Sequence, residues 1–286
     1  MLFSIIIPCF NSKGFLRKCL DSILSQSFSD FEVIAINDGS TDGTSEILDE
    51  YNSKYPFVHV YHFSNSGVSI SRKRGITLAT GEYIIFVDSD DTIAPNLLFN
   101  LHKAIISYKK PDLIRYQSNL INDVANKDHE RYNFTTNVEI PCTGLEALKM
   151  WSSPGKKYAV YWLFAFKSSI FSKVLFVTTL RCYEDVSLIP ILIASSNKVV
   201  TIDYVGYNYT CNNSTSLTNI RSIKAELSRA EDFYKAYLYA IENFAKLKNV
   251  SSIDIAFFVS DYTRRLKGKY DSLPNSLKPN FQHWFK

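Results

Sequence analysis

The first 108 residues predict an α/β fold, in which a parallel sheet is covered by helices on both faces. Short β-branched and aromatic runs, typical of buried strands, alternate there with segments whose apolar residues recur at helical spacing. The 286-residue chain is 46% apolar and 21% charged, which is ordinary for a globular protein and sufficient for a large core. This composition excludes a disordered chain, a collagen-like repeat and a small disulfide-stabilised scaffold.

Four strands and four helices are expected in this part of the chain. The strands are short apolar runs at Phe3–Ile7, Phe31–Ile36, Val58–Phe63 and Tyr83–Val87. Pro8 is expected to end the first strand. The helices are expected at 14–26, 42–51, 68–80 and 94–108. Ser40 or Thr41 is expected to cap the second helix, and Gly81 to stop the third.

Beyond residue 110 the pattern is less regular. Strand-like pieces occur near 112–118 and 157–166, and the sequence becomes helical from about Asn219 to the end. We therefore expect one domain over 1–218, made of the halves 1–110 and 111–218, and a C-terminal helical extension over 219–286.

The charge is unevenly spread. The whole chain carries 32 − 28 = +4, whereas residues 221–286 alone hold 12 basic and 7 acidic side chains, which gives +5. A basic tail predicts contact with an anionic neighbour such as a membrane surface, and a solvated helical face is the alternative. This charge density does not predict nucleic-acid binding.

The sequence also predicts a cellular compartment. Its N-terminus has no basic region or small-residue cleavage site of a secretory signal, and no run of about 18 apolar residues exists. The five cysteines are odd in number and show no C-x-x-C spacing. We expect a cytoplasmic protein with reduced thiols, at most peripheral on the inner face of the plasma membrane.

Polar residues cluster directly after three of the expected strands, at Pro8–Asn11, Asn37–Asp42 and Asp88–Asp91. The carboxyl ends of parallel strands meet at one edge of a sheet, where ligand sites of open α/β sheets lie. The sequence therefore predicts one site built from these three segments.

The third segment holds three carboxylates in four residues, Asp88-Ser89-Asp90-Asp91. Carboxylates this close repel one another, and a hard divalent cation with oxygen ligands would neutralise them. We expect Mg²⁺ or Mn²⁺ here, together with waters and phosphate oxygens. A polar turn that caps the next helix is the alternative interpretation.

Two further positions suit a phosphorylated nucleoside. Asp38 could accept hydrogen bonds from a base or ribose, and Gly39 would let a ligand approach the backbone closely. Arg72 lies near a predicted helix start, where its guanidinium could clamp a diphosphate. Turn formation is the alternative for Asp38, and a plain surface position is the alternative for Arg72. Lys73 and Arg74 are expected to be solvated.

Three ordered blocks of this chain resemble the family 2 glycosyltransferases of the GT-A fold, and they are Ser4–Asn11, Asn37–Asp42 and Gly81–Asp91. The resemblance implies a Rossmann-like mixed sheet flanked by helices. It also implies a metal-dependent enzyme that takes a nucleotide-diphosphate sugar, usually UDP-linked. Residues 1–110 would then be the nucleotide-sugar-binding half, and 111–218 the acceptor-binding half.

The same resemblance implies roles for individual residues. Asp90 would be the main ligand of Mn²⁺ or Mg²⁺, with Asp88 beside it, and Arg72 would contact the diphosphate. Pro8, Phe10 and Asp38 would contact the nucleoside. The full set of residues expected to bind the nucleotide sugar is Pro8, Phe10, Asn11, Asp38, Arg72, Asp88, Ser89 and Asp91.

In the second half, Tyr183-Glu184-Asp185 resembles the family's Glu-Asp pair, whose Asp is the catalytic base. Asp185 would remove the proton from an acceptor hydroxyl during a single displacement that inverts the anomeric centre. The donor sugar would be a hexose or N-acetylhexosamine. The acceptor would be a glycan or a lipid-diphosphate-linked sugar of surface polysaccharide or lipopolysaccharide. Capping of a helix N-terminus is the alternative for this pair.

The chain departs from the family pattern at Lys73, where the family commonly has Asn, and at Tyr207–Thr210, where a closing loop commonly ends in Arg. Two other functions remain open. Asp88 and Asp90 also fit the nucleophile motif of haloacid dehalogenase-like phosphatases, although that motif usually follows a first strand. A non-catalytic protein on the same fold could bind the nucleotide sugar without transferring it.

Overall fold

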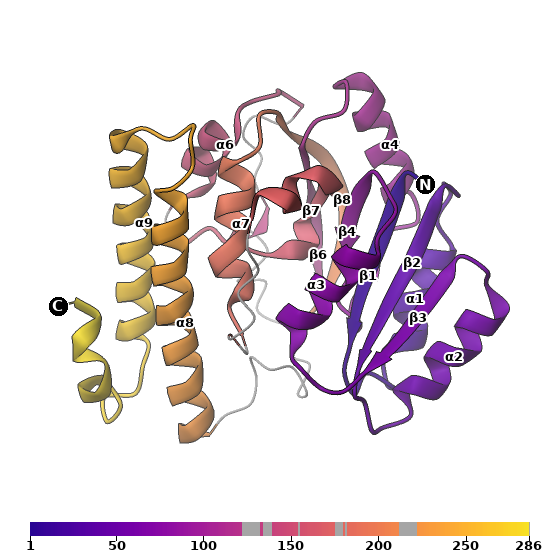
Figure 1. Ribbon diagram of the computed structural model, residues 1–286, viewed down its shortest axis with the longest axis horizontal. Coiled ribbons are helices and arrows are strands. Elements are labelled where there is room, and N and C mark those ends of the chain that lie inside the picture. Colours follow the sequence, from indigo (N-terminus) through magenta and orange to yellow (C-terminus); the bar gives the residue numbers. More distant parts are fainter. Residues whose placement is uncertain are drawn as a thin grey trace.

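One sheet with helices on both faces makes up most of the molecule (Figure 1). The computed structural model describes residues 1–121, 132–133, 139–153, 155–174, 180, 182–211 and 222–285. Within these residues the sheet has eight strands in the order β3-β2-β1-β4-β7-β6-β8-β5. The strands are β1 Phe3–Cys9, β2 Phe31–Asp38, β3 Val58–Phe63, β4 Tyr83–Phe86, β5 Thr92–Ile93, β6 Leu113–Ile121, β7 Phe164–Lys167 and β8 Val199–Thr210.

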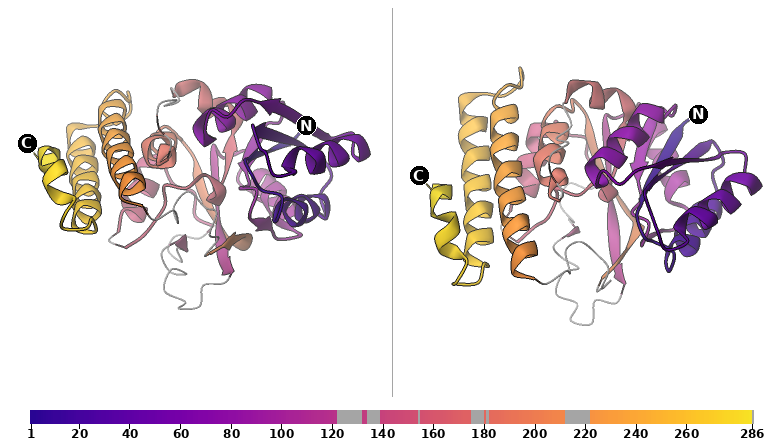
Figure 2. Two further views of the ribbon diagram at one scale, coloured as in Figure 1. Left: turned by 90° about the horizontal axis from the view of Figure 1, so that it is seen from below. Right: turned by 60° about the horizontal axis from the view of Figure 1, so that its bottom comes forward.

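The helices form two layers around this sheet and a third group at one end. Helix α3 lies in front of β1 and β4 in Figure 1, and α1 lies behind the strands. Helices α7, α8 and α9 stand side by side at the far end from the N-terminus, in both orientations of Figure 2. The α-helices are α1 Leu16–Leu24, α2 Thr44–Lys54, α3 Val68–Leu78, α4 Leu97–Ser107, α6 Gly144–Trp151, α7 Glu184–Ala194, α8 Ile223–Phe244 and α9 Ser252–Asp271. The 3₁₀ helices are η1 Tyr161–Leu163, η2 Ser168–Lys173 and η3 Lys278–Phe285.

The predicted α/β fold is confirmed, and all eight elements expected in the first 108 residues are present. The sheet is mixed, as the family resemblance implies, because β7 runs antiparallel to both β4 and β6. Strand β1 continues through Pro8 to Cys9, so the expectation that Pro8 ends it is wrong. Only Phe3–Ile6 of β1 pairs with β4, so the proline lies beyond that ladder and interrupts none of its hydrogen bonds.

The expected cap of α2 is also wrong. The helix begins at Thr44, and the carboxylate of Asp42 accepts the backbone N–H of Thr44 at 3.1 Å. Ser40 and Thr41 instead bind Asn11: the Asn11 N–H donates to Ser40 Oγ at 3.0 Å, and the Thr41 N–H donates to Asn11 Oδ1 at 2.8 Å. These bonds fasten the loop after β1 to the loop after β2.

The core is continuous from the sheet into the C-terminal helices. Phe244 of α8 and Phe258 of α9 belong to the same buried cluster as Ile5 of β1. A smaller cluster between α8, α9 and η3 includes Leu266 and Trp284. The expected domain boundary at 218/219 lies outside the described residues. No helix in the described part of the chain combines the length and apolar character needed to cross a bilayer.

Two elements of the second half have no counterpart in the sequence-based expectations. Helix α6 lies between β6 and β7, and β8 is a 12-residue strand that pairs with both β6 and β5. The segment Tyr207–Thr210, expected in a loop, is the end of β8. Because β5 follows the acidic segment directly, β8 brings the second half of the chain to the predicted site.

Candidate active site

The loops after β1 and β2 form one wall of the site. Pro8 is buried within β1, whereas the Phe10 side chain is 50% exposed immediately after it. Asn11 has a φ of 49°, a left-handed conformation that asparagine tolerates better than most residues. With its side chain bound to the β2 loop, Asn11 leaves the aromatic face of Phe10 available at the sheet edge.

Asp38 is buried by the start of α3. Its carboxylate accepts the backbone N–H groups of Ser66, at 3.0 Å, and Gly67, at 2.7 Å, and lies 3.4 Å from a guanidinium nitrogen of Arg74. Arg74 was expected to be solvated, but its side chain is only 26% exposed. Its guanidinium also lies 4.0 Å from the ring centroid of Phe63. Asp38 thus holds the N-terminus of α3 against the end of β2.

Gly39 was expected to admit a ligand close to the backbone. Its φ is +76°, and a Cβ there would lie 2.7 Å from the backbone nitrogen of Asn65. The close approach that requires glycine is therefore made by the chain itself, which corrects the expected reason for this residue.

The three acids after β4 have different surroundings. The Asp88 side chain is 27% exposed and that of Asp90 is partly buried, so both border the sheet edge. Asp91 is 1% exposed, and its carboxylate accepts the Tyr207 hydroxyl at 2.7 Å and the Thr210 N–H at 2.6 Å. Burial, followed by the charges of its two neighbouring acids, raises the pKa of Asp91 well above its usual range. Asp91 therefore anchors the end of β8, and its expected role in binding the nucleotide sugar stays a prediction.

Ser89 lies between these acids and is buried. Its hydroxyl is 2.6 Å from the hydroxyl of Ser12, and the Ser12 N–H donates to Thr44 Oγ1 at 2.8 Å. This chain of contacts brings the expected segments after β1, β2 and β4 together at one edge, as parallel pairing requires. Ser89 reaches a neighbouring loop and is not itself directed to an open surface.

Arg72 is the central cation of the site and is 6% exposed. One guanidinium nitrogen donates to Asp88 Oδ1 at 2.7 Å, and another donates to Glu184 at the start of α7. Although burial opposes it, the charges of these carboxylates raise the pKa of Arg72. The guanidinium lies over the Tyr161 ring, 4.8 Å from its centroid. Arg72 therefore joins the acidic segment of the first half to the expected base segment of the second half.

Two carboxylates open α7, and the second is the expected base. Asp185 is partly buried, and its Oδ1 accepts the backbone N–H of Val186 at 2.7 Å. Burial, followed by the charge of Glu184, raises the pKa of Asp185 to about 7. A carboxylate with this pKa can accept a proton near neutral pH, which is the requirement for a general base.

The acids suit a metal ion that the protein and a substrate coordinate together. Among the described residues, no group of three or more His, Cys, Asp or Glu side chains is arranged to hold a metal ion. Asp88 and Asp90 still offer the hard oxygen donors that Mg²⁺ and Mn²⁺ accept when phosphate oxygens complete the coordination. The donor set fits a cation delivered with a diphosphate, and it does not fit an all-protein cage.

Two aromatic residues complete the site: Tyr161 was not expected there from the sequence, and Tyr207 was expected in a loop. Tyr161 lies between Arg72 and Phe86, with its buried hydroxyl lacking a hydrogen-bond partner in the described structure. Tyr207 bonds to Asp91, and Asp88 donates its N–H to the Tyr207 hydroxyl at 3.1 Å. Tyr161 lies in the short 3₁₀ helix η1, and Tyr207 lies in β8, a strand that was not expected from the sequence, so no periodic signal indicated which way either side chain faces.

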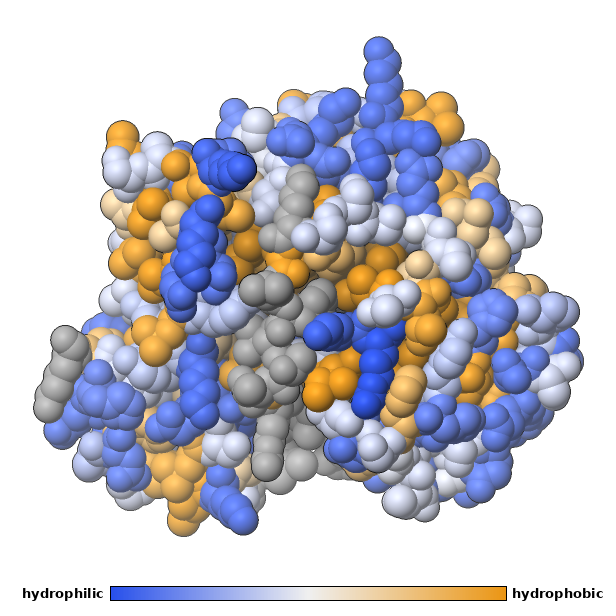
Figure 3. All heavy atoms as spheres, in the orientation of Figure 1, coloured by the Kyte–Doolittle hydropathy of each residue, from blue (hydrophilic) through white to orange (hydrophobic). Residues whose placement is uncertain are grey.

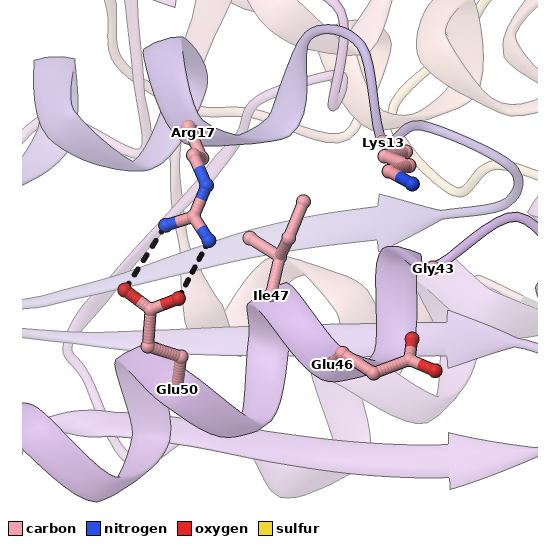
Figure 4. Close-up of a pocket in the computed structure, with 6 residues that line it drawn as sticks. All are labelled: Lys13, Arg17, Gly43, Glu46, Ile47 and Glu50. Atoms are coloured by element: carbon pink, nitrogen blue, oxygen red, sulfur yellow. Dashed lines mark hydrogen bonds and ion pairs between the residues drawn. The ribbon is translucent and has the colours of Figure 1, made fainter.

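A pocket of about 480 Å³ lies beside the site, between α1 and α2 (Figure 4). Arg17 and Glu50 form a two-point ion pair across it, with distances of 3.0 and 2.6 Å. Its lining includes none of the three polar segments and consists of Lys13, Arg17, Gly43, Glu46, Ile47 and Glu50. This open surface feature is separate from the acids after β4.

Several basic side chains of the C-terminal tail are paired within the protein. Asp261 accepts hydrogen bonds from both Arg264 and Arg265, and Lys267 pairs with Asp271 at 3.2 Å. Hydrophilic and hydrophobic residues are interspersed over the visible sides of α8 and α9 in Figure 3. The expected contact of this tail with a membrane surface stays a prediction.

Comparison with known proteins agrees with this geometry. Residues 4–173, more than half of the chain, match the family described as Glycosyl transferase family 2, and the chain therefore belongs to that family. An uncharacterized glycosyltransferase of Escherichia coli, YibD, is 45% identical over 94 residues. That stretch covers 33% of this chain and 27% of the relative, so the match spans about a quarter of the relative's length.

Two solved structures share the fold. S. aureus TarS 1-349 in complex with UDP-GlcNAc has a TM-score of 0.78 at 19% identity, covering 99% of this chain and 79% of that chain. The mannosyltransferase PcManGT from Pyrobaculum calidifontis, in complex with GDP-Man and Mn²⁺, has a TM-score of 0.57 at 14% identity, covering 98% and 78%. The predicted GT-A fold, including the helical C-terminal region, is confirmed.

Proposed function

We propose that this chain is an inverting glycosyltransferase that moves a hexose or N-acetylhexosamine from a UDP-sugar to an acceptor hydroxyl. The observation that carries the proposal is Arg72, which bonds to Asp88 after β4 and to Glu184 beside Asp185. This bridge places the acids that suit a sugar diphosphate next to the carboxylate that suits a base. Family membership and the UDP-GlcNAc complex of a protein with the same fold support a UDP-linked donor.

The donor would lie along the carboxyl edge of β1, β2 and β4. The exposed ring of Phe10 offers a stacking surface for the nucleobase, and Asn11 and Asp38 shape the loops around it. Asp88 and Asp90 would hold Mn²⁺ or Mg²⁺, which would neutralise charge on the departing diphosphate. Arg72 lies against Asp88, where its guanidinium adds positive charge to the same place.

Asp185 would act on the acceptor. Its carboxylate takes the proton of the attacking hydroxyl, and the new bond forms on the face of the anomeric carbon opposite the leaving group. A single displacement of this kind inverts the anomeric centre and needs no protein nucleophile. The acceptor we propose is a glycan or lipid-diphosphate-linked sugar of surface polysaccharide.

A thermal-shift screen tests the donor class. UDP-sugars, GDP-sugars and free phosphate are each added with and without Mn²⁺, because a ligand that binds the folded state raises Tm by mass action. We expect a metal-dependent response to UDP-sugars. A response to phosphate alone, with phosphomonoester hydrolysis, would favour the phosphatase alternative, in which Asp88 is a nucleophile.

A hydrolysis assay separates the enzyme from a non-catalytic binding protein. Slow release of UDP from the preferred donor in Mn²⁺, with water in place of the acceptor, is expected of a glycosyltransferase. Donor binding without any release of UDP, in the presence of a mixed pool of glycan acceptors, would contradict the proposal.

A further inference from the structure

Helix α7, which begins with Glu184 and Asp185, contains a proline. Pro190 has no N–H, so it cannot donate the helical hydrogen bond that residue 190 would otherwise give to the carbonyl of Val186. That carbonyl lies in the first turn of the helix, next to the proposed base. The sequence of α7 therefore leaves one backbone acceptor without its usual partner at the point where Asp185 must be held.

A residue of α9 supplies the missing donor. The hydroxyl of Tyr262 donates to the carbonyl oxygen of Val186 at 2.7 Å, and the two residues are 76 positions apart in the sequence. Tyr262 is 2% exposed, and its ring centroid lies 4.3 Å from that of Phe258, which stacks in turn on Phe244. This packing fixes the hydroxyl in place, so the bond replaces the one that Pro190 cannot make.

The residue before α7 is held independently by the same two helices. Tyr183 adopts a φ of 65°, an uncommon left-handed conformation for a bulky residue. Its ring packs edge-on against Phe233 of α8, with centroids 5.1 Å apart, and the ammonium of Lys269 of α9 lies 5.6 Å from its centroid. Contacts from α8 and α9 thus fix both sides of the Glu184–Asp185 pair.

We propose that the C-terminal helices belong to the catalytic apparatus, with Tyr262 as a positioning residue that holds Asp185 through the first turn of α7. The inference deepens the proposed function and depends on Asp185 being the base. Tyr262 and Pro190 both lie beyond residue 173, where the match to the family ends. The hydroxyl touches no reacting group, and we infer that it acts on Asp185 through the Val186 carbonyl.

Tyr262→Phe removes only this hydroxyl, and Tyr83→Phe is its matched control. The buried Tyr83 hydroxyl also donates to a backbone carbonyl at 2.7 Å, that of Pro111, at the opposite end of β4 from the acids. We expect Tyr262→Phe to lower kcat about 10-fold to 100-fold, the scale of a small misplacement, with the KM for the donor unchanged. Tyr83→Phe should lose similar thermal stability while retaining kcat.

Pro190→Ala provides a rescue. An alanine at 190 restores the N–H that can bond to Val186, so removal of the Tyr262 hydroxyl in this background should cost only about 2-fold in kcat. Equal losses of kcat in Tyr262→Phe and Tyr83→Phe would overturn the inference. So would a loss in the Pro190→Ala background as large as in the natural sequence.

Hydrogen exchange separates this inference from the proposed function. In Tyr262→Phe, the amide of Ser187, which bonds to the Tyr183 carbonyl, and the amides that follow it in α7 should exchange faster, and Pro190→Ala should restore their protection. If no nucleotide sugar is turned over but this pattern holds, the proposed activity fails while the role of Tyr262 in ordering α7 stands. Unchanged exchange in Tyr262→Phe would remove that role, whatever the activity.

Discussion

The donor side and the base side of the site are built in different ways. On the donor side, polar residues follow directly after β1, β2 and β4, and parallel pairing alone brings the strand ends together. On the base side, Glu184 and Asp185 start a helix that depends on contacts from α3, α8 and α9. The local sequence therefore specifies the donor side, whereas residues distant in the chain specify the base side. The donor side should therefore tolerate changes in the C-terminal helices, and the base side should not.

The largest expected effect comes from the residue that joins the two sides. Arg72→Leu removes the guanidinium that pairs with both Glu184 and Asp88. Removing one partner of a buried ion pair lowers the free energy of unfolding by about 3–5 kcal/mol. Denaturant unfolding measures this loss. Arg17→Leu is the control, because its ion pair with Glu50 is exposed, and we expect little change there. Equal losses in the two variants would show that the bridge is not structurally important.

Asp185→Asn tests whether the base side can be disabled alone. We expect kcat to fall about 100-fold or more, because the proton acceptor is lost, while the Tm increase produced by UDP and Mn²⁺ is retained. Asp203→Asn, at an exposed position of β8, should leave both quantities unchanged. Near-normal turnover in Asp185→Asn would place the base elsewhere.

Asp91→Asn tests whether Asp91 anchors β8, in contrast to Asp90, which we propose to be a metal ligand. The Asp91 carboxylate accepts two hydrogen bonds from β8, and an amide NH₂ would face one of those donors. Loss of a buried hydrogen bond of this kind costs about 1–3 kcal/mol in unfolding experiments. Asp90→Asn should instead preserve stability and weaken the Mn²⁺-dependent response to UDP. If Asp91→Asn abolished that response without lowering Tm, Asp91 would be a ligand and not an anchor.

The pH dependence of kcat reports the surroundings of Asp185. Its raised pKa, about 7, means that the group is protonated and inactive as a base below that pH. We expect kcat to rise about tenfold per pH unit below 7 and to level off above it. The pH affects stability in the opposite direction. Because the folded state binds the proton of Asp185 more tightly than the unfolded chain does, protonation of Asp185 stabilises the fold at low pH. This stabilisation is lost as pH rises toward 7. A kcat profile that is flat between pH 5 and 8 would contradict the role.

The sequence predicted the elements of the first half because each one is a short apolar run or a helical repeat followed by polar residues. Gly39 shows the limit of this reasoning. A close approach to its backbone was predicted, but the group that approaches is Asn65, whose position depends on how the chain returns after β3. Asp91 shows the same limit, since nothing in the order Asp88–Asp91 indicates which acid turns toward β8.

The Glu184–Asp185 pair could be singled out from the sequence, but its surroundings could not be predicted. The Glu184–Asp185 pair was recognisable by its resemblance to the family, whereas its supports are distant in the chain. Arg72 is 112 residues from Glu184, and Tyr207 is 116 residues from Asp91. Local periodicity carries no information about such pairings. Pro190 was visible in the sequence, but the donor that compensates for it could be identified only from the packing of α9.

The pairing of β5 with β8 limits how the two halves can move. Thr92 and Ile93 form a ladder with Asn208 and Tyr207, directly after the acids, while β4 pairs with β7 on the other side. A hinge that opened the halves like a clamshell would have to shear both ladders and break the bonds of Asp91 to β8. The two ladders therefore favour movements of individual side chains over a movement of one half of the sheet against the other.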